Sequence, residues 1–209
     1  MSEALVTLAI GMIAGAVRVG TPYLFVSLGE CITEKSGRVN LGLEGILVSG
    51  AMCGYAVSYL TQSAWIGVGC AAGVGLMLGL LHGLVCSLPR VNDIAFGIAV
   101  MLLGTGLAFF LGKPYIQPQA PQLPSLALGA WSGDPRWQSA LAVNALFPIG
   151  IALALLLHWG LRSTALGLAL RLVGDHEGTA RALAYPVLKV RIAATAIGGA
   201  FAGVGGAYL

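Results

Sequence analysis

The stretch Ala64–Leu88, AWIGVGCAAGVGLMLGLLHGLVCSL, decides the fold of this chain. It is apolar from end to end, and a helix of this length, rising about 1.5 Å per residue, crosses a hydrocarbon core of about 30 Å. Three of its glycines recur at four-residue spacing, where small residues let a neighbouring membrane helix approach closely. The stretch therefore predicts a tightly packed transmembrane helix. Glycines at this spacing predict such packing in several places: Gly75, Gly79 and Gly83 here, then Gly50/Gly54, Gly69/Gly73 and Gly199/Gly203.

The composition of the whole chain agrees with a membrane protein. Its 209 residues are 57% hydrophobic and 9% charged, whereas soluble domains carry about 25% charged residues. We predict an all-α polytopic membrane protein, one transmembrane domain over residues 1–209 with about six transmembrane helices, the last incomplete. The first helix is expected to be irregular, because Arg18 and Pro22 interrupt it. The other apolar segments cover residues 4–28, 41–60, 94–112, 141–160 and 192–209.

Basic residues gather in the connections after the first, third and fifth apolar segments. The opposite side has only Lys113 and Arg136, both between the fourth and fifth segments. Short loops rich in Lys and Arg stay in the cytosol, so we expect these three connections inside and the N-terminus outside. The net charge of +3 then reflects topology and does not indicate nucleic-acid binding. The basic residues of the three connections are Lys35, Arg38, Arg90, Arg162, Arg171, Arg181, Lys189 and Arg191.

The largest cytosolic connection, residues 161–191, is expected to form a stiff docking surface for a soluble partner. After a first helical stretch, Asp175 can cap a short helix. The apolar residues of that helix recur at i, i+3, i+4 and i+7, as Ala180, Leu183, Ala184 and Val187. An interfacial helix that rests on anionic lipid is the alternative. The connection on the other side, residues 113–140, is Pro-rich, which favours an extended external linker.

Four polar residues near helix ends are candidates for lining a substrate pathway: Asn40, Glu44, Asn92 and Asp93. A carboxylate at membrane depth needs a partner or water, and Glu44 could accept a hydrogen bond from Asn40 or a nearby arginine. A helix-end anchor near the headgroups is the alternative for Glu44. For Asp93, capping and the helix dipole at the start of the fourth segment explain the residue by themselves, and this structural role is preferred to a substrate contact.

No catalytic or metal-binding motif is present. The chain has no G-x-S-x-G, no H-E-x-x-H and no P-loop, so we assign no catalytic residue, metal or cofactor. Energy from ATP would have to come from a partner. The cysteines have no metal-like spacing and are expected to be small buried hydrophobes: Cys31, Cys53, Cys70 and Cys86.

Two motifs carry a family resemblance. KSGRVNLGLEG, at Lys35–Gly45, and TALGLALRLVGDHEGTARALAYPVLKVR, at Thr164–Arg191, resemble the permeases of ABC importers for nucleosides and simple sugars. These belong to a larger group that includes ribose and branched-chain amino-acid permeases. The chain departs from the family pattern at His176–Glu177, where Asn-Pro is usual, and at Ala184, where Gly is usual. It also lacks the Ser and Asn that nucleoside permeases often carry in the fourth segment.

The resemblance implies a type II ABC-importer-like bundle in the bacterial cytoplasmic membrane, working by alternating access. Its partners would be ABC ATPase subunits, a second related permease subunit, and an external solute-binding protein or lipoprotein. Residues 161–191 would be the coupling segment, with docking fixed by Arg171, Gly174, Asp175 and Arg181. The family continues for several more spans, so we expect a C-terminally truncated sequence. Branched-chain amino acids or another small solute, or a passive channel, are the alternatives.

Overall fold

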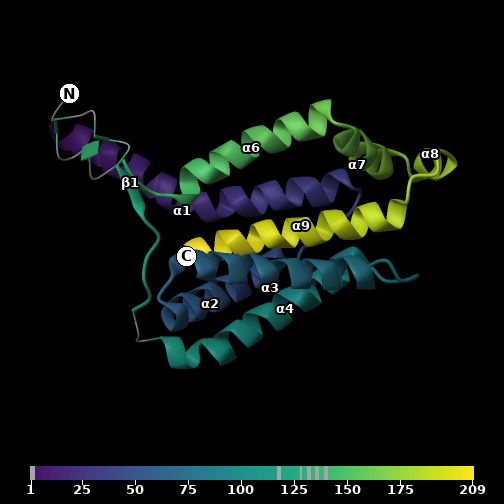
Figure 1. The fold of residues 1–209 in the computed structure, drawn as a ribbon, viewed down its shortest axis with the longest axis horizontal. Coiled ribbons are helices and arrows are strands. Elements are labelled where there is room, and N and C mark those ends of the chain that lie inside the picture. The colour runs from purple at the N-terminus through teal and green to yellow at the C-terminus, as the bar shows by residue number, and fades with distance from the viewer. Residues whose placement is uncertain (1–2, 117–118, 128, 131–132, 135–136, 139–140) are drawn as a thin grey trace.

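The computed structural model describes residues 3–116, 119–127, 129–130, 133–134, 137–138 and 141–209. Within these residues, six helices are long and apolar enough to cross a membrane, and they run roughly along the long axis of the molecule (Figure 1). The predicted all-α membrane fold is therefore confirmed. The six helices are α1 (Glu3–Lys35), α2 (Leu43–Thr61), α3 (Ala64–Val85), α4 (Asp93–Gly112), α6 (Leu146–Ser163) and α9 (Val187–Tyr208).

Shorter elements join the six helices. A 3-10 turn, η1 (Lys113–Tyr115), follows α4, and the strands β1 (Ser125–Ala127) and β2 (Ala142–Asn144) pair antiparallel before α6. Two short helices, α7 (Ala165–Asp175) and α8 (Glu177–Ala182), connect α6 to α9.

Helix α9 is the centre of the bundle, because it packs on α1, α2 and α3. Its contact with α3 is made by backbone: a Cβ on Gly75 would collide with the carbonyl oxygen of Gly199, and one on Gly79 with that of Thr195. The predicted glycine face of α3 is thus confirmed. In contrast, a Cβ on Gly69 or Gly73 would meet nothing within 4 Å in the described structure, so that pair was wrongly predicted to pack.

The same close packing joins α9 to α2 and α1. A Cβ on Gly50 of α2 would lie 2.7 Å from the carbonyl oxygen of Gly203, and Gly54 lies against Ala207. On the other side, a Cβ on Gly29 of α1 would collide with the carbonyl oxygen of Gly198. Small residues on all three partners therefore surround α9 with direct helix–helix contacts.

Helix α1 is continuous through Pro22, so the predicted interruption of the first span is wrong. Proline removes one backbone hydrogen bond inside a helix. Next to it, the Thr21 hydroxyl donates to the carbonyl oxygen of Val17 at 2.6 Å. Pro22 itself is buried, and a Cβ on Gly205 of α9 would lie 2.7 Å from its carbonyl oxygen. Packing against α9 holds the helix together where local propensity would break it.

Two predicted helix starts need correction. The fifth span begins at Leu146 instead of residue 141, because residues 142–144 pair with β1 as strand β2. The sixth begins at Val187 instead of residue 192, directly after Pro186, whose ring suits the entry to a helix. Lys189 and Arg191 therefore belong to a helix.

The connections after α1 and α3 lie at the same end of the bundle as α7 and α8, which we call the basic end (Figure 1). The strand β1 and the last residue, Leu209, lie at the opposite end. This shared position confirms that the three basic connections are on one side. Of the two cations predicted opposite them, Lys113 follows α4, and Arg136 lies outside the described residues.

Candidate functional site

The connection of α6 to α9 is a folded unit. Thr164 begins it: its hydroxyl accepts from the backbone N–H of Gly167 at 3.1 Å and donates to the carbonyl oxygen of Gly160 at 2.6 Å. A Cβ on Gly167 would collide with the carbonyl oxygens of Gly160 and Leu161. This close contact lets α7 fold back against the end of α6.

Three apolar side chains hold α7, α8 and α9 together: Val173, Ala180 and Val187 form a buried cluster. Asp175 is the last residue of α7, and the residue that precedes α8 is His176, so the predicted capping role of Asp175 is wrong. Helix α8 ends at Ala182, so Leu183 and Ala184 do not continue its apolar face and are exposed instead.

The four predicted coupling residues have different surroundings. Arg171 is half-buried, and its Nε donates to the carbonyl oxygen of Gly167 at 3.4 Å. Gly174 lies against the end of α1, where a Cβ would collide with the carbonyl oxygen of Lys35. Asp175 is exposed. Arg181 is 67% exposed and pairs with Glu177. The structure thus brings Gly174 to the bundle and leaves Arg181 at the surface.

The ion pairs of Glu177 with Arg181 and Arg191 were not predicted from the sequence. Glu177 accepts from Arg181 at 2.6 Å and from Arg191 at 2.8 Å. Hydrogen bonds from Arg181, and then the bond and the charge of Arg191, lower the pKa of Glu177 below its ordinary value of 4.5. The i, i+4 spacing of Glu177 and Arg181 was a signal for the first pair. Arg191 was counted only as a topology-setting charge.

A partly buried ion pair lies where the α1–α2 connection meets α4. Arg38, 6% exposed, donates through Nη1 to Asp93 Oδ1 at 3.1 Å and through Nη2 to the Ser87 hydroxyl at 3.1 Å. Asn92, not Asp93, caps α4, since its Oδ1 accepts from the backbone N–H groups of Ile94 and Ala95. Asp93 is therefore the partner of Arg38, and the predicted capping role belongs to its neighbour.

The other two pathway candidates do not meet. The side-chain Oδ1 of Asn40 accepts from the backbone N–H of Gly42 at 2.9 Å, and the backbone N–H of Asn40 donates to Glu30 Oε1 at 3.0 Å. Glu44 is exposed in the first turn of α2. The predicted bond between Asn40 and Glu44 is wrong, because Asn40 turns back on its own backbone. Glu30 was missed; the signal was a carboxylate inside the first apolar helix.

Buried polar atoms remain without partners around this connection. Oε2 of Glu30, Nε of Arg38 and Nδ2 of Asn40 form no hydrogen bond with the described part of the chain. Next to Arg38, Cys86 closes α3, and burial raises the pKa of its thiol to about 11. In the described residues, no group of three His, Cys, Asp or Glu side chains could hold a metal ion.

A second polar region at the basic end is a cavity of about 550 Å³ between α1 and the end of α7. Ser27, Glu30, Cys31 and Glu34 share one face of α1, because they are spaced by three or four residues. Gly174 and Asp175 form the facing wall. Polar side chains along a membrane helix face protein or water rather than lipid, so this face is a candidate for lining a pathway.

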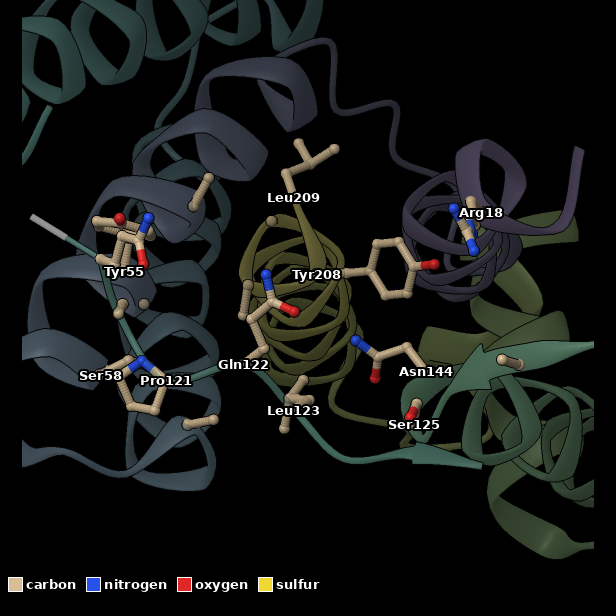
Figure 2. A pocket seen from close by; sticks show the side chains of 18 residues that line it. Arg18, Tyr55, Ser58, Pro121, Gln122, Leu123, Ser125, Asn144, Tyr208 and Leu209 are labelled. Atoms are coloured by element: carbon tan, nitrogen blue, oxygen red, sulfur yellow. The ribbon is translucent and has the colours of Figure 1, made fainter. Parts of the chain in front are cut away.

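The opposite end of the bundle carries a cavity of about 680 Å³ around the end of α9. Figure 2 shows the Tyr208 side chain pointing from α9 toward Arg18 of α1, with Gln122 from the connection after α4 and Asn144 from β2 close by. Tyr55 and Ser58 of α2 line the other side. Hydroxyl, amide and aromatic groups predominate among the polar side chains of this cavity.

Comparison with known proteins identifies the family. Residues 12–209 match the model for the permease component of branched-chain amino acid transport systems. The chain is 33% identical over 206 residues to a putative glucose ABC transporter permease protein, TsgC13, of Haloferax volcanii, covering 96% of this chain and 63% of that protein. It is 28% identical to the guanosine ABC transporter permease protein NupQ of Bacillus subtilis, covering 88% of this chain and 62% of that protein.

A third relative, the nucleoside ABC transporter permease protein NupC of Lactococcus lactis, is 28% identical, covering 94% of this chain and 66% of that protein. The chain thus spans less than two thirds of the length of each of these curated relatives. The comparison with solved structures found no match. The relatives are named as ABC transporter permeases. The family match over residues 12–209 and the six apolar helices lead to one conclusion: the chain belongs to the family of permease components of branched-chain amino acid transport systems.

Proposed function

We propose that this chain is a membrane-spanning permease subunit of an ATP-driven importer for nucleosides or simple sugars. It is not itself an enzyme, and a separate ABC ATPase hydrolyses the ATP. A second, related permease completes the pore, and an external solute-binding protein or lipoprotein delivers the solute. The names of the relatives, which are glucose, guanosine and nucleoside permeases, support this solute class.

The distribution of charge supports an orientation in the bacterial cytoplasmic membrane. Loops rich in Lys and Arg stay in the cytosol, so the basic end faces the cytosol and the end with β1 and Leu209 faces out. In this orientation residues 113–140 are an external connection. Residues 161–191 are then cytosolic, within reach of an ATPase.

One observation carries the coupling role: α7 and α8 stand at the basic end as a unit that is anchored on one face and exposed on the other. Val173, Ala180 and Val187 are buried, whereas Arg181 and Leu183 are 67% and 61% exposed. ATP binding would move this unit as a rigid body and change which end of the pathway is open. Of the predicted coupling residues, Arg181 and Asp175 then meet the ATPase, while Arg171 and Gly174 hold the segment in place.

For the pathway, the contacts favour Glu44 and the polar face of α1 over the other candidates. Asn92 caps α4, and Asp93 pairs with Arg38. The side chain of Asn40 bonds to the backbone of its own turn. Glu44 is the pathway candidate left with an exposed carboxylate. Ser27 and Glu30 offer acceptors for the hydroxyl groups of a sugar or nucleoside.

Import of branched-chain amino acids is the second candidate, and the description of the matching family favours it. The test is uptake of labelled guanosine, glucose and leucine by the assembled transporter in proteoliposomes, with and without ATP. We expect ATP-dependent uptake of guanosine or glucose. Uptake of leucine alone would select the second candidate, and equal uptake without ATP would identify a channel and refute the proposal.

The coupling role has its own test. Arg181→Glu reverses an exposed charge and places a second carboxylate beside Glu177, so uptake should fall about tenfold or more while ATP hydrolysis continues. Arg90→Glu is the matched control, since Arg90 is exposed at the same end but lies in the α3–α4 connection. If both variants kept the uptake of the wild type, residues 161–191 would not be the coupling segment.

A further inference from the structure

Arg191 of α9 reaches three separate elements with one guanidinium group. Nε donates to the carbonyl oxygen of Ser36 at 3.1 Å, Nη1 to Glu177 Oε2 at 2.8 Å, and Nη2 to the carbonyl oxygen of Val173 at 3.4 Å. Ser36 follows α1, Val173 lies in α7, and Glu177 is the first residue of α8. The Arg191 side chain is 19% exposed, so water competes little for these bonds.

The backbone around this group is shaped to bring the elements together. Gly37 has φ +82, in the left-handed region that favours glycine. A Cβ on Gly37 would lie 3.1 Å from the Cα of Gly174 and 3.3 Å from Nη2 of Arg191. The α1–α2 connection and the end of α7 therefore meet backbone to backbone, directly beside the guanidinium.

Glu177 links this buried group to the surface. Its Oε2 accepts from Arg191, and its Oε1 accepts from Nε and Nη2 of Arg181 at 2.9 and 2.6 Å. Arg181 is 67% exposed, whereas Arg191 is largely covered. One carboxylate thus joins the exposed arginine of α8 to the arginine that holds α1, α7 and α9.

We propose that Arg191 is a positioning residue that transmits movement of α7 and α8, the helices of the coupling segment 161–191, to the transmembrane helices. This inference rests on the proposed coupling role of that segment. Displacement of α8 pulls on Glu177, and the fixed fork of the guanidinium carries the displacement to α9 and to the connection after α1. Arg191 contacts neither solute nor ATPase in this scheme.

The first test uses the full chain in lipid nanodiscs, without any partner. Amide hydrogen exchange in residues 173–182 should be about tenfold faster in Arg191→Gln than in the wild type, because the variant loses the ionic bond and the fixed fork. Exchange in α3 should stay unchanged. Lys189→Gln is the matched control, since Lys189 is an exposed cation in the same turn of α9. Equal exchange in both variants and the wild type would overturn the proposal.

A charge swap tests whether all the bonds of Arg191 are needed, or whether its ion pair with Glu177 is sufficient. Arg191→Glu combined with Glu177→Arg restores an ion pair but not the bonds from position 191 to Ser36 and Val173. Exchange should therefore remain fast in the swap, and recovery of wild-type exchange would show that the pair alone matters. If Arg191→Gln does not accumulate in the membrane, Arg191→Lys keeps the charge and one donor group, and its exchange should still be faster.

The assembled transporter provides the functional readout. Arg191→Gln should keep ATP hydrolysis but move about tenfold less solute per ATP, whereas Arg90→Gln should keep the wild-type ratio. An unchanged ratio of solute moved to ATP hydrolysed in Arg191→Gln would contradict the proposal that Arg191 transmits the movement. Absence of ATP-dependent uptake in the wild type would instead refute the proposed function, and hydrogen exchange in the isolated chain would still decide whether Arg191 holds the segment.

Discussion

Replacing Gly75 by alanine tests whether α3 and α9 are held together by direct backbone contact. A Cβ at this position would collide with the carbonyl oxygen of Gly199, so the two helices must part by about 1 Å. Overpacking costs roughly 1–3 kcal/mol, and the better helix propensity of alanine offsets about 1 kcal/mol of this. Separation at Gly75 also loosens the neighbouring contact of Gly79 with Thr195. We expect a net loss of about 1–2 kcal/mol in the free energy of unfolding.

The matched control is Gly73→Ala, two residues earlier in the same helix. A Cβ on Gly73 meets nothing within 4 Å in the described structure, so this variant keeps only the propensity gain of up to about 1 kcal/mol. Unfolding of each variant in mixed micelles of increasing SDS content, followed by circular dichroism, gives the free energies. The two variants should differ by about 1–3 kcal/mol. Equal stabilities would refute direct contact between the two backbones.

Three further outcomes are expected. Asp93→Leu should destabilise the fold by about 2–3 kcal/mol because it leaves the Arg38 guanidinium buried and unpaired, and Asp93→Leu with Arg38→Met should recover most of that loss in the same SDS assay. The pKa of Glu177 is lowered, so its ion pairs stabilise the fold fully above pH 4.5 and are lost as pH falls through the lowered pKa. The difference in melting temperature between wild type and Glu177→Gln should therefore be present at pH 7 and shrink below pH 4.5. Ala184 has φ +59, so Ala184→Gly should relieve strain and raise the free energy of unfolding by about 1 kcal/mol.

The helices were predictable because a membrane span has a simple signature. An apolar run of about 20 residues is sufficient evidence, and α3 begins at Ala64 as predicted. The predicted helix boundaries were wrong where contacts with residues far away in the sequence determine the structure. Residues 142–144 became a strand because β1 pairs with them, and Pro22 stayed helical because α9 packs against it. Neither partner can be read from the local sequence.

The candidate site was predictable as a segment but not as a set of contacts. Gly69, Gly73, Gly75 and Gly79 look alike in the sequence, and only the position of α9 distinguishes them. Asn92 and Asp93 are both suitable N-cap residues. Asn92 caps α4 because Asp93 pairs with Arg38, which is 55 residues away in the sequence. Arg191 donates to the carbonyl oxygen of Ser36, 155 residues away in the sequence. No local sequence pattern predicts this contact.

The close backbone contacts at glycines between α9 and its neighbours limit how the molecule can change shape. A side chain can switch rotamer to accommodate a sliding neighbour, but a peptide group in contact with another peptide group has no such freedom. Helices α1, α2, α3 and α9 are joined in this way at Gly29, Gly50, Gly75 and Gly203, so we expect them to move as one block. Any opening and closing motion then takes place at the edges of this block, where α6 rests on α1 through the side chains of Leu24 and Phe25.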